Sequence, residues 1–153
     1  TDIGEPSYRG VLFRRTTKDL KKSLVDRSHK FYPSVGGTYH KTDRVWTFPS
    51  GAQISLEHMQ NPGDERRFDS AEFQFVGFDE LTHFTRQQYI FMLSRLRSSD
   101  GIRPRLRAGT NPGNIGHEWV FRRWAPWLDA RPEYTGQRAR SGALALVAMQ
   151  ARR

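Results

Sequence analysis

Short apolar runs and amphipathic stretches alternate along the chain. The segment 8–15 has an apolar centre, Val11 to Phe13, that predicts a buried strand. Two threonines then precede a stretch, 18–33, in which large apolar residues recur near helical spacing. A hydroxyl side chain at such a place is a good N-cap, and proline disfavours helical geometry in the residue before it. We therefore expect a helix that ends before Pro33.

The next part of the chain has the pattern of a hairpin followed by a loop. Residues 44–48 and 52–58 alternate in polar character on either side of the Pro-Ser-Gly sequence at 49–51. This arrangement predicts two antiparallel strands joined by a turn. Residues 60–70, QNPGDERRFDS, are charged and lack any periodicity, so we expect an exposed loop.

A second strand-and-helix pattern occupies the following part of the sequence. Residues 73–78, FQFVGF, form a nearly unbroken apolar run typical of a strand buried on both faces. Thr85 can cap a helix that ends near residues 100–101, and its apolar face is predicted to hold Tyr89, Met92, Leu93 and Leu96. Residues 104–110 predict another strand and 116–124 another helix. Strands separated by helices indicate an α/β fold with a mostly parallel central sheet flanked by helices, and the hairpin is an insertion in it.

Composition narrows the classes of protein to consider. The 153 residues suit about one domain. A net charge of +9 indicates polyanionic partners such as nucleic acid or nucleotide phosphates. The absence of cysteine excludes disulfide scaffolds, thiolate zinc sites and cysteine nucleophiles, and fits a reducing cytoplasm. The longest apolar stretch, 143–149, is far too short to span a membrane, so no membrane partner is expected.

Two adjacent carboxylates, Asp79 and Glu80, follow the apolar run at 73–78. Magnesium prefers hard oxygen ligands, and a carboxylate at the end of a rigid strand can hold it directly or through water. A second carboxylate beside it can orient or deprotonate an attacking water in phosphoryl transfer. The pattern has the form of a Walker B element. The alternative is that these carboxylates only cap the turn after the strand.

A second polar strand end is Gly109 to Gly113, GTNPG. Ligands of open α/β sheets bind beyond the carboxyl ends of the strands, so Thr110 and Asn111 could face the same crevice as the carboxylates and sense a terminal phosphate. The alternative is that Asn-Pro-Gly is ordinary turn chemistry.

The order and spacing of these pieces resemble a known family. The run FQFVGFDELTHFTRQQYIFMLSRLR, followed by GIRPRLRAGTNPGNIGHEWVFRRW, closely resembles the ATPase domain of the large terminase subunit of tailed bacteriophages. The earlier VLFRRTTKDLKKSLVDRS looks like the segment that follows the phosphate-binding helix in that family. The resemblance covers about residues 8–127.

This resemblance implies a motor in which ATP hydrolysis, with Mg²⁺, drives double-stranded DNA into a preformed capsid. It implies a P-loop NTPase fold in which Asp79 is the magnesium carboxylate of Walker B and Glu80 the catalytic carboxylate. Thr110 and Asn111 would be the coupling motif that links the hydrolytic state to movement. The implied partners are the small terminase subunit, the portal protein and further copies of the motor subunit. The implied location is the cytoplasm of a bacterial host, for a phage or prophage protein.

The sequence departs from the family at the phosphate-binding loop. A Walker A element, G-x-x-x-x-G-K-[ST], needs a lysine directly after glycine, and no lysine of this chain has one. The chain also does not begin with methionine, and the nuclease domain that the resemblance leads us to expect after the ATPase domain is not among its 153 residues. We therefore expect an internal piece of a terminase or a truncated prophage product, with a partial ATPase domain at 1–128 and a basic tail at 129–153. Such a fragment is expected to be inactive alone.

Several other residues have a functional and a structural interpretation. The resemblance implies that the loop before the Walker B strand can carry an arginine that reaches into a neighbour's site, so Arg66 and Arg67 are candidate arginine fingers. The alternative is that they are solvated loop residues. His83 stands in an E-x-x-H spacing with Glu80 and is either a metal ligand or a neighbour of the carboxylates. His117 and Glu118 are expected to be capping and surface groups. Three tryptophans are expected to pack or, beside basic residues, to stack on a base: Trp119, Trp124 and Trp127.

Two further classes of function stay open. The chain could be a non-catalytic, basic nucleic-acid-binding or assembly remnant that keeps the fold without the chemistry. It could also be a metal-dependent nuclease that uses Asp79, Glu80 and His83.

Overall fold

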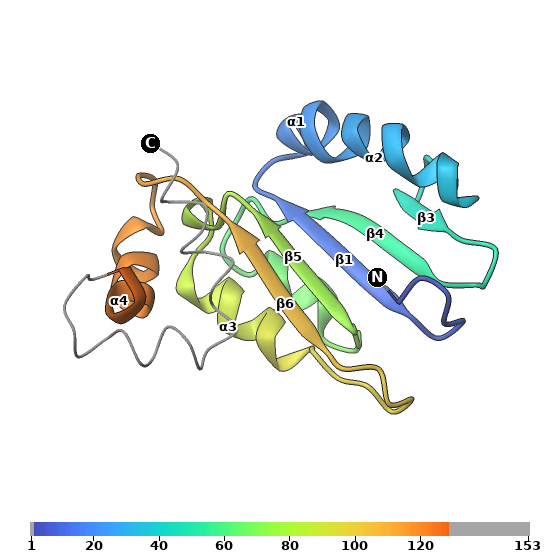
Figure 1. Cartoon of the computed structure of the whole chain (residues 1–153). Coiled ribbons are helices and arrows are strands. Elements are labelled where there is room, and N and C mark those ends of the chain that lie inside the picture. Colours follow the sequence, from blue (N-terminus) through green and yellow to red (C-terminus); the bar gives the residue numbers. More distant parts are fainter. Residues whose placement is uncertain (1, 129–153) are drawn as a thin grey trace.

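A computed structural model describes residues 2–128 and contains one six-stranded sheet in the order β2-β3-β4-β1-β5-β6 (Figure 1). Strands β4, β1, β5 and β6 run parallel, and β2 and β3 pair antiparallel to extend the sheet beyond β4. The strands are β1 (Arg9–Arg14), β2 (Thr38–His40), β3 (Val45–Thr47), β4 (Gln53–His58), β5 (Phe75–Asp79) and β6 (Arg105–Gly109). The predicted mostly parallel sheet and its hairpin are confirmed, and the short edge strand β2 is an addition to it.

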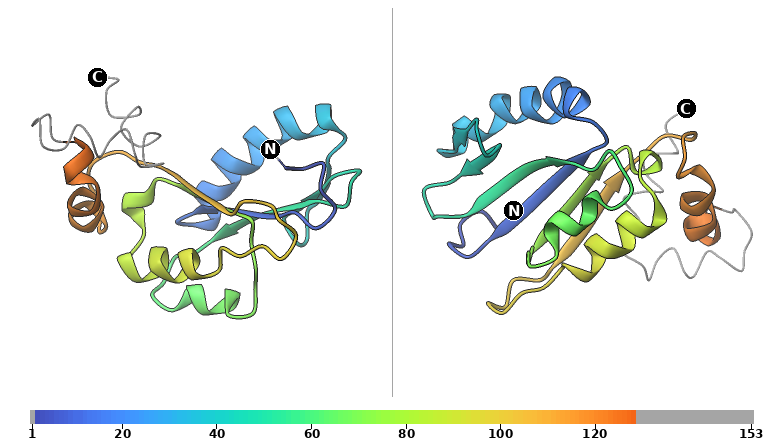
Figure 2. Two further views of the ribbon diagram at one scale, coloured as in Figure 1. Left: turned by 60° about the horizontal axis from the view of Figure 1, so that its bottom comes forward. Right: turned by 180° about the vertical axis from the view of Figure 1, so that it is seen from behind.

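Helices cover both faces of the sheet (Figure 2). One face carries a continuous helical run made of α1 (Thr17–Leu20), the π-helix η1 (Lys21–Val25), α2 (Asp26–Phe31) and the 3₁₀ turn η2 (Tyr32–Val35). The other face carries α3 (Arg86–Ser94), α4 (His117–Leu128) and the short 3₁₀ helices η3 (Asp64–Phe68) and η4 (Leu81–His83). The α/β class predicted from the alternating pattern is therefore correct.

The strand sequences supply two hydrophobic cores, because successive side chains of a strand point to opposite faces. Val11 and Phe13 of β1 lie in the core under α3 and are fully buried. Leu12 packs against the other core, beneath the α1–α2 run, which is centred on Trp46 and Leu56. The apolar run of β1 thus serves both faces, as expected of a strand in the middle of a sheet.

The first helical run begins where the sequence predicts and is less regular than predicted. The Thr16 hydroxyl accepts a hydrogen bond from the Asp19 backbone N–H at 3.1 Å and caps the helix. The run passes through a π-turn, and its α-helical part ends at Phe31, before Pro33 as predicted. Pro33 lies in the 3₁₀ turn that closes the run. The buried Trp46 indole donates to the Ser28 hydroxyl at 2.9 Å and ties this run to β3.

Helix α3 ends at Ser94, so the predicted end near residues 100–101 is wrong. Its start is the predicted one: Thr85 and Gln88 form a reciprocal capping box. Beyond Ser94 the chain pairs with the start of the β5 segment instead of continuing the helix. The Phe73 N–H donates to the Arg95 carbonyl at 3.0 Å, and the Arg97 N–H donates to the Phe73 carbonyl at 3.1 Å.

Helix α4 extends to Leu128, past the predicted end at residue 124. Its start is pressed against η4, since the Gly116 N–H donates to the Thr82 carbonyl at 2.8 Å. Within residues 2–128, no helix is long and apolar enough to cross a membrane. The predicted basic tail at 129–153 lies outside the described residues.

Candidate functional site

The parallel strands bring their carboxyl ends to one edge of the sheet. Asp79, the last residue of β5, is in register with Gly109, the last residue of β6. Glu80 and Thr110 therefore begin adjacent loops, and Asn111 follows directly. The sequence predicted that these polar strand ends would share one crevice, and the structure brings Glu80 and Asn111 into contact. This edge is where ligands bind in open α/β sheets.

Asp79 is paired with an arginine of the neighbouring strand. The Arg14 Nε donates to the Asp79 Oδ2 at 2.7 Å, and the two side chains are 18% and 33% exposed. Phe13 and Phe78 are opposite each other in the β1–β5 register, so the two charged residues leave adjacent strands at the same level. Arg14 was not among the site residues predicted from the sequence. Its place at the end of the first apolar run was the available signal, because parallel strands end at the same edge.

Glu80 has a backbone conformation that is uncommon for a residue with a side chain. Its φ of 62° and ψ of 66° lie in the left-handed region. Both carboxylate oxygens accept hydrogen bonds from Asn111: the backbone N–H donates at 3.2 Å and the side-chain Nδ2 at 3.0 Å. Strained residues of this kind concentrate at functional sites. The arrangement holds the Glu80 carboxylate against the end of β6.

Thr110 is joined to η4 by a buried chain of hydrogen bonds. Its hydroxyl accepts from the Thr82 N–H at 3.0 Å and donates to the Thr82 hydroxyl at 2.9 Å. The Thr82 hydroxyl in turn donates to the Asn111 carbonyl at 2.9 Å. Thr110 is 7% exposed and Thr82 is 2% exposed. The Thr110 hydroxyl is thus committed to protein partners, whereas Asn111 is exposed.

The donor set at this edge suits magnesium better than a transition metal. Asp79 offers a partly exposed carboxylate, and Mg²⁺ typically takes one or two carboxylates and completes its shell with water and phosphate oxygens. Across residues 2–128, no three histidine, aspartate or glutamate side chains are grouped to hold a metal. Asp79, Glu80 and His83 therefore do not form the three-ligand centre that the nuclease alternative requires.

The two candidate arginine fingers lie in η3 and differ in their contacts. Both are exposed. The Arg67 guanidinium donates to the His58 carbonyl and to the Asp64 carbonyl and lies over the Phe68 ring, so it is tethered to its own subunit. Arg66 makes no side-chain hydrogen bond within the described residues. The geometry therefore favours Arg66 over Arg67 as the arginine available to another molecule.

A buried polar network anchors η3 to the rest of the domain. Glu65 is 1% exposed, and its carboxylate accepts from the Gly63 N–H at 3.0 Å and from Gln87 Nε2 at 2.9 Å. Gln88 is fully buried and accepts from the Arg15 guanidinium at 3.2 Å. Burial lowers the pKa of Arg15. This network was not predicted from the sequence, because a charged loop gives no sign that one of its carboxylates is buried.

His58, the last residue of β4, is a titratable group at the same sheet edge. Burial lowers its pKa below the ordinary value of 6.5, and the positive charges of Arg67 and Arg44 lower it further. The imidazole is therefore neutral near pH 7. Its Nδ1 is buried and has no hydrogen-bond partner within residues 2–128.

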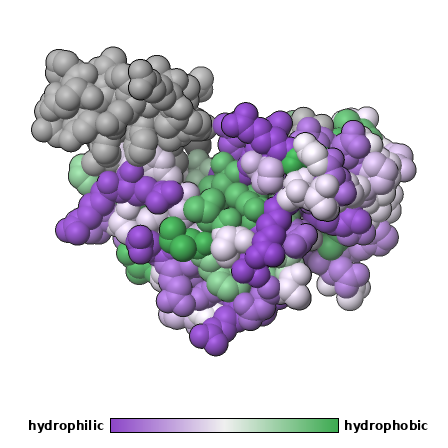
Figure 3. All heavy atoms as spheres, turned by 90° about the horizontal axis from the view of Figure 1, so that it is seen from below, coloured by the Kyte–Doolittle hydropathy of each residue, from purple (hydrophilic) through white to green (hydrophobic). Residues whose placement is uncertain are grey.

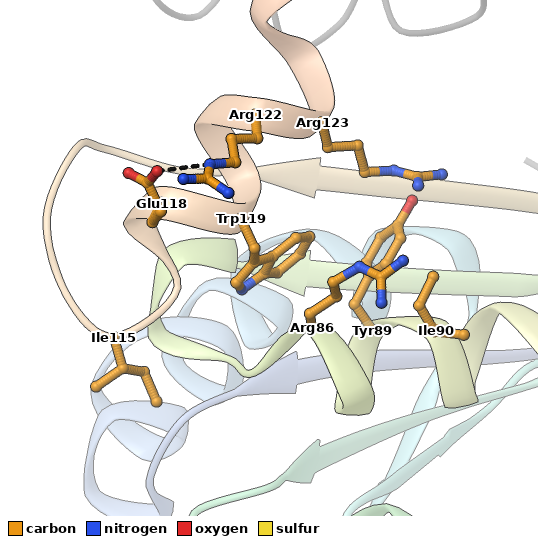
Figure 4. A pocket seen from close by; sticks show the side chains of 8 residues that line it. All are labelled: Arg86, Tyr89, Ile90, Ile115, Glu118, Trp119, Arg122 and Arg123. Carbon is orange, nitrogen blue, oxygen red and sulfur yellow. Dashed lines mark hydrogen bonds and ion pairs between the residues drawn. The ribbon is translucent and has the colours of Figure 1, made fainter.

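A pocket of about 590 Å³ lies between α3 and α4, and neither Asp79 nor Glu80 lines it (Figure 4). Basic, aromatic and aliphatic side chains share its walls: Arg86, Tyr89, Ile90, Ile115, Glu118, Trp119, Arg122 and Arg123. Hydrophobic residues also gather in the middle of the face seen in Figure 3, between hydrophilic areas. The helix α3 contributes the part-exposed Ile90 and Leu93 to the surface.

The residues at the start of α4 have the structural roles expected of them. The His117 Nδ1 accepts from the Gly113 N–H at 3.2 Å, and Glu118 pairs with Arg122 at 2.6 Å on the exposed face. Trp119 donates to the Phe84 carbonyl at 2.9 Å, and Trp124 is 8% exposed. Both tryptophans pack against Tyr89 of α3. The side chain of Trp127 lies outside the described residues.

Comparison with known proteins identifies the family. A model of the N-terminal part of the terminase large subunit, T4likevirus-type, matches residues 4–141. The fold is similar to that of the large terminase from a thermophilic bacteriophage, with a TM-score of 0.56 and 18% sequence identity. That match covers 71% of this chain and 27% of the phage protein, so this chain spans about a quarter of that protein's length. No curated protein matches the chain. The chain belongs to the T4likevirus-type terminase large subunit family, in the region of its N-terminal part.

Proposed function

We propose that the chain is part of the ATP-hydrolysing motor subunit that packages double-stranded phage DNA into capsids. Family membership supports this proposal, and the activity belongs to the complete subunit. The proposed partners are double-stranded DNA, the small terminase subunit, the portal protein and further copies of the motor subunit. ATP and Mg²⁺ are the proposed cofactors of the complete protein.

The observation that carries the proposal is the contact between Glu80 and Asn111 beside Asp79. A catalytic carboxylate must be held at a fixed place to orient or deprotonate a water. Glu80 is held by two hydrogen bonds from the adjacent strand end, and its left-handed backbone turns it away from the path of β5. Ordinary capping of the following turn needs neither feature. The geometry therefore supports the catalytic interpretation of Glu80 over the capping one.

Asp79 is the residue proposed to hold the cation. A bound Mg²⁺ supplies charge neutralisation for phosphate oxygens in phosphoryl transfer. The chain supplies the Asp79 carboxylate from the end of β5, a strand that forms backbone hydrogen bonds with the strands on both of its sides. The backbone of such a ligand needs little reorganisation when the cation binds.

Thr110 and Asn111 are proposed to couple the site to motion. The hydrogen-bond chain through Thr82 links the end of β6 to η4, and the start of α4 is bonded to the same turn by Gly116. A change in the Glu80–Asn111 contact would therefore be transmitted to η4 and α4. Phosphate sensing is assigned to the exposed Asn111, because the Thr110 hydroxyl is occupied.

Arg66 is proposed as the arginine finger toward a neighbouring subunit. It is exposed on η3, whose backbone is held by the buried Glu65. A guanidinium presented on a rigid turn can stabilise the charge of a transition state in another subunit's site. Arg67 serves as the internal tether of the same turn.

The 153-residue chain alone is proposed to hydrolyse ATP poorly. No lysine follows a glycine in it, so it lacks the loop that would cradle the β and γ phosphates. The chain is expected to supply the Walker B carboxylates and the coupling residues. The rest of the subunit is expected to supply the loop that cradles the phosphates.

The test is ATP turnover by the complete large subunit carrying Glu80→Gln. We expect nucleotide binding to persist and turnover to fall by roughly a hundredfold or more, since the carboxylate base is lost. The matched control is Glu118→Gln, which neutralises an exposed carboxylate of α4 and should leave turnover unchanged. Normal turnover by the Glu80→Gln subunit would refute the assignment.

The alternative is a non-catalytic, basic nucleic-acid-binding or assembly remnant, which the net charge of +9 favours. Binding through phosphates weakens steeply with salt. If the chain bound duplex DNA with a steep salt dependence, and joining it to the missing parts of the subunit restored no ATPase activity, the remnant would be the correct interpretation.

A further inference from the structure

We propose that Arg14 is the resident counter-ion of Asp79, and that a divalent cation that binds Asp79 displaces it. The inference rests on the proposed function, since it takes Asp79 as the cation ligand. It adds a positioning residue that the family resemblance did not supply. The displaced guanidinium then becomes available to the phosphate that accompanies the cation.

The backbone fixes the two residues at neighbouring positions, so only their side chains can separate. Arg14 and Asp79 follow the paired residues Phe13 and Phe78 on adjacent parallel strands. The Nε of Arg14 lies 2.7 Å from the Asp79 Oδ2. Both side chains are partly exposed, at 18% and 33%, so solvent, a cation or a phosphate can reach the pair.

A cation and the guanidinium compete for the same carboxylate. Mg²⁺ binds carboxylate oxygens at about 2.0–2.1 Å and demands near-octahedral geometry. A metal on Asp79 would stand within a few ångströms of the Arg14 charge, and like charges at such a separation repel strongly in a partly desolvated site. The guanidinium occupies Oδ2 of Asp79, so cation binding at this carboxylate favours opening of the ion pair.

The open state gives Arg14 a new partner. A guanidinium has five N–H donors arranged to bind phosphate in a bidentate manner. Within the described residues, the one side-chain hydrogen bond of Arg14 is the contact with Asp79, so its other donors have no protein partner there. A polyphosphate arriving with the cation would satisfy the released guanidinium. Because of this exchange of partners, the binding free energy of the cation is more favourable when polyphosphate binds with it than when the cation binds alone.

The first experiment measures Mn²⁺ binding to the full chain by electron paramagnetic resonance, without nucleotide. Arg14→Gln should bind Mn²⁺ about 2- to 5-fold more tightly than the unaltered chain, because a competing, partly exposed ion pair is removed. Arg14→Lys keeps the charge and should stay near the unaltered value. Arg27→Gln, which removes an exposed charge on α2, controls for net charge and should have no such effect.

The outcomes separate this inference from the proposed function. Asp79→Asn should abolish the Mn²⁺ site; if it does not, Asp79 is no cation ligand and both proposals fail. If Asp79→Asn abolishes the site and Arg14→Gln leaves the affinity unchanged or weaker, only the role of Arg14 is overturned.

A second measurement uses the unaltered chain and so does not depend on the folding of a variant. The Arg14 Nε–H signal in ¹⁵N nuclear magnetic resonance should exchange slowly with water while Asp79 accepts its hydrogen bond. Saturating Mg²⁺ should speed that exchange, and added inorganic triphosphate should slow it again. A signal that does not respond to Mg²⁺ would contradict displacement.

Discussion

The buried hydrogen bonds between Thr110 and Thr82 predict a defined stability cost for Thr110→Val. Valine has nearly the shape of threonine, so the change removes one hydroxyl and leaves the packing in place. The Thr82 N–H loses its acceptor, and the Thr82 hydroxyl loses its donor. Thr82 is 2% exposed, so water cannot easily replace the lost partner.

The magnitude follows from leaving a buried N–H unsatisfied. Such a group costs about 1–3 kcal/mol. The Thr82 hydroxyl keeps its own bond to the Asn111 carbonyl, so a second unsatisfied donor does not arise. For a chain of this size, each kcal/mol lowers the melting temperature by roughly 2–4 °C. Thr110→Val is therefore expected to lower it by about 2–12 °C.

The assay is urea unfolding of the full chain followed by circular dichroism, with the free energy of unfolding obtained by linear extrapolation. Thr38→Val is the matched control, because Thr38 is exposed on the edge strand β2 and its change should stay within about 0.5 kcal/mol. Equal free energies for the two variants would refute the reasoning that the Thr110–Thr82 bonds hold the ends of β5 and β6 together.

Two further predictions concern the helix contact at η4 and the histidine at the end of β4. Gly116→Ala would place a Cβ 2.5 Å from the Phe84 carbonyl oxygen, so it should lower the free energy of unfolding in urea by about 1–3 kcal/mol. The control is Gly4→Ala, whose Cβ would meet no atom within 4 Å and should leave the stability unchanged. Equal effects of the two changes would contradict the close contact at Gly116. The pKa of His58 in the folded chain is lower than its ordinary value of 6.5. Between these two pKa values the unfolded chain binds more protons at this residue than the folded chain does. The free energy of unfolding should therefore fall as the pH falls from above 6.5 toward the folded-state pKa. His58→Gln should weaken that dependence between about pH 7.5 and 5.5, and an unchanged dependence would show that other groups cause it.

The sheet was predictable because its strands carry strong local signals. The apolar run of β5 and the alternation around residues 49–51 each identify a strand without knowledge of its neighbours. The end of α3 was not predictable in this way. Leu96 continues the helical spacing, but the backbone groups of the residues on either side of it form hydrogen bonds with Phe73. This contact joins residues that are far apart in the sequence. Tertiary pairing overrode local propensity there.

The candidate site was predictable in part for a similar reason. Polar residues directly after apolar runs indicated Asp79, Glu80 and Asn111, because parallel strands end at one edge. Arg14 also follows an apolar run, but basic residues are so frequent in this chain that the position did not stand out. The buried Glu65 lies in a loop with no periodicity, and only its contacts reveal that it is structural.

The central claim is that Glu80 and Asn111 form one functional unit at the sheet edge. The most direct test is ATP turnover and nucleotide affinity, measured together, for the complete large subunit carrying Asn111→Ala. Loss of the side-chain support from Asn111 should misplace the carboxylate, so kcat should fall about 10- to 100-fold while nucleotide affinity stays within about twofold. An unchanged kcat would contradict the account, because Asn111 would then be only part of a turn.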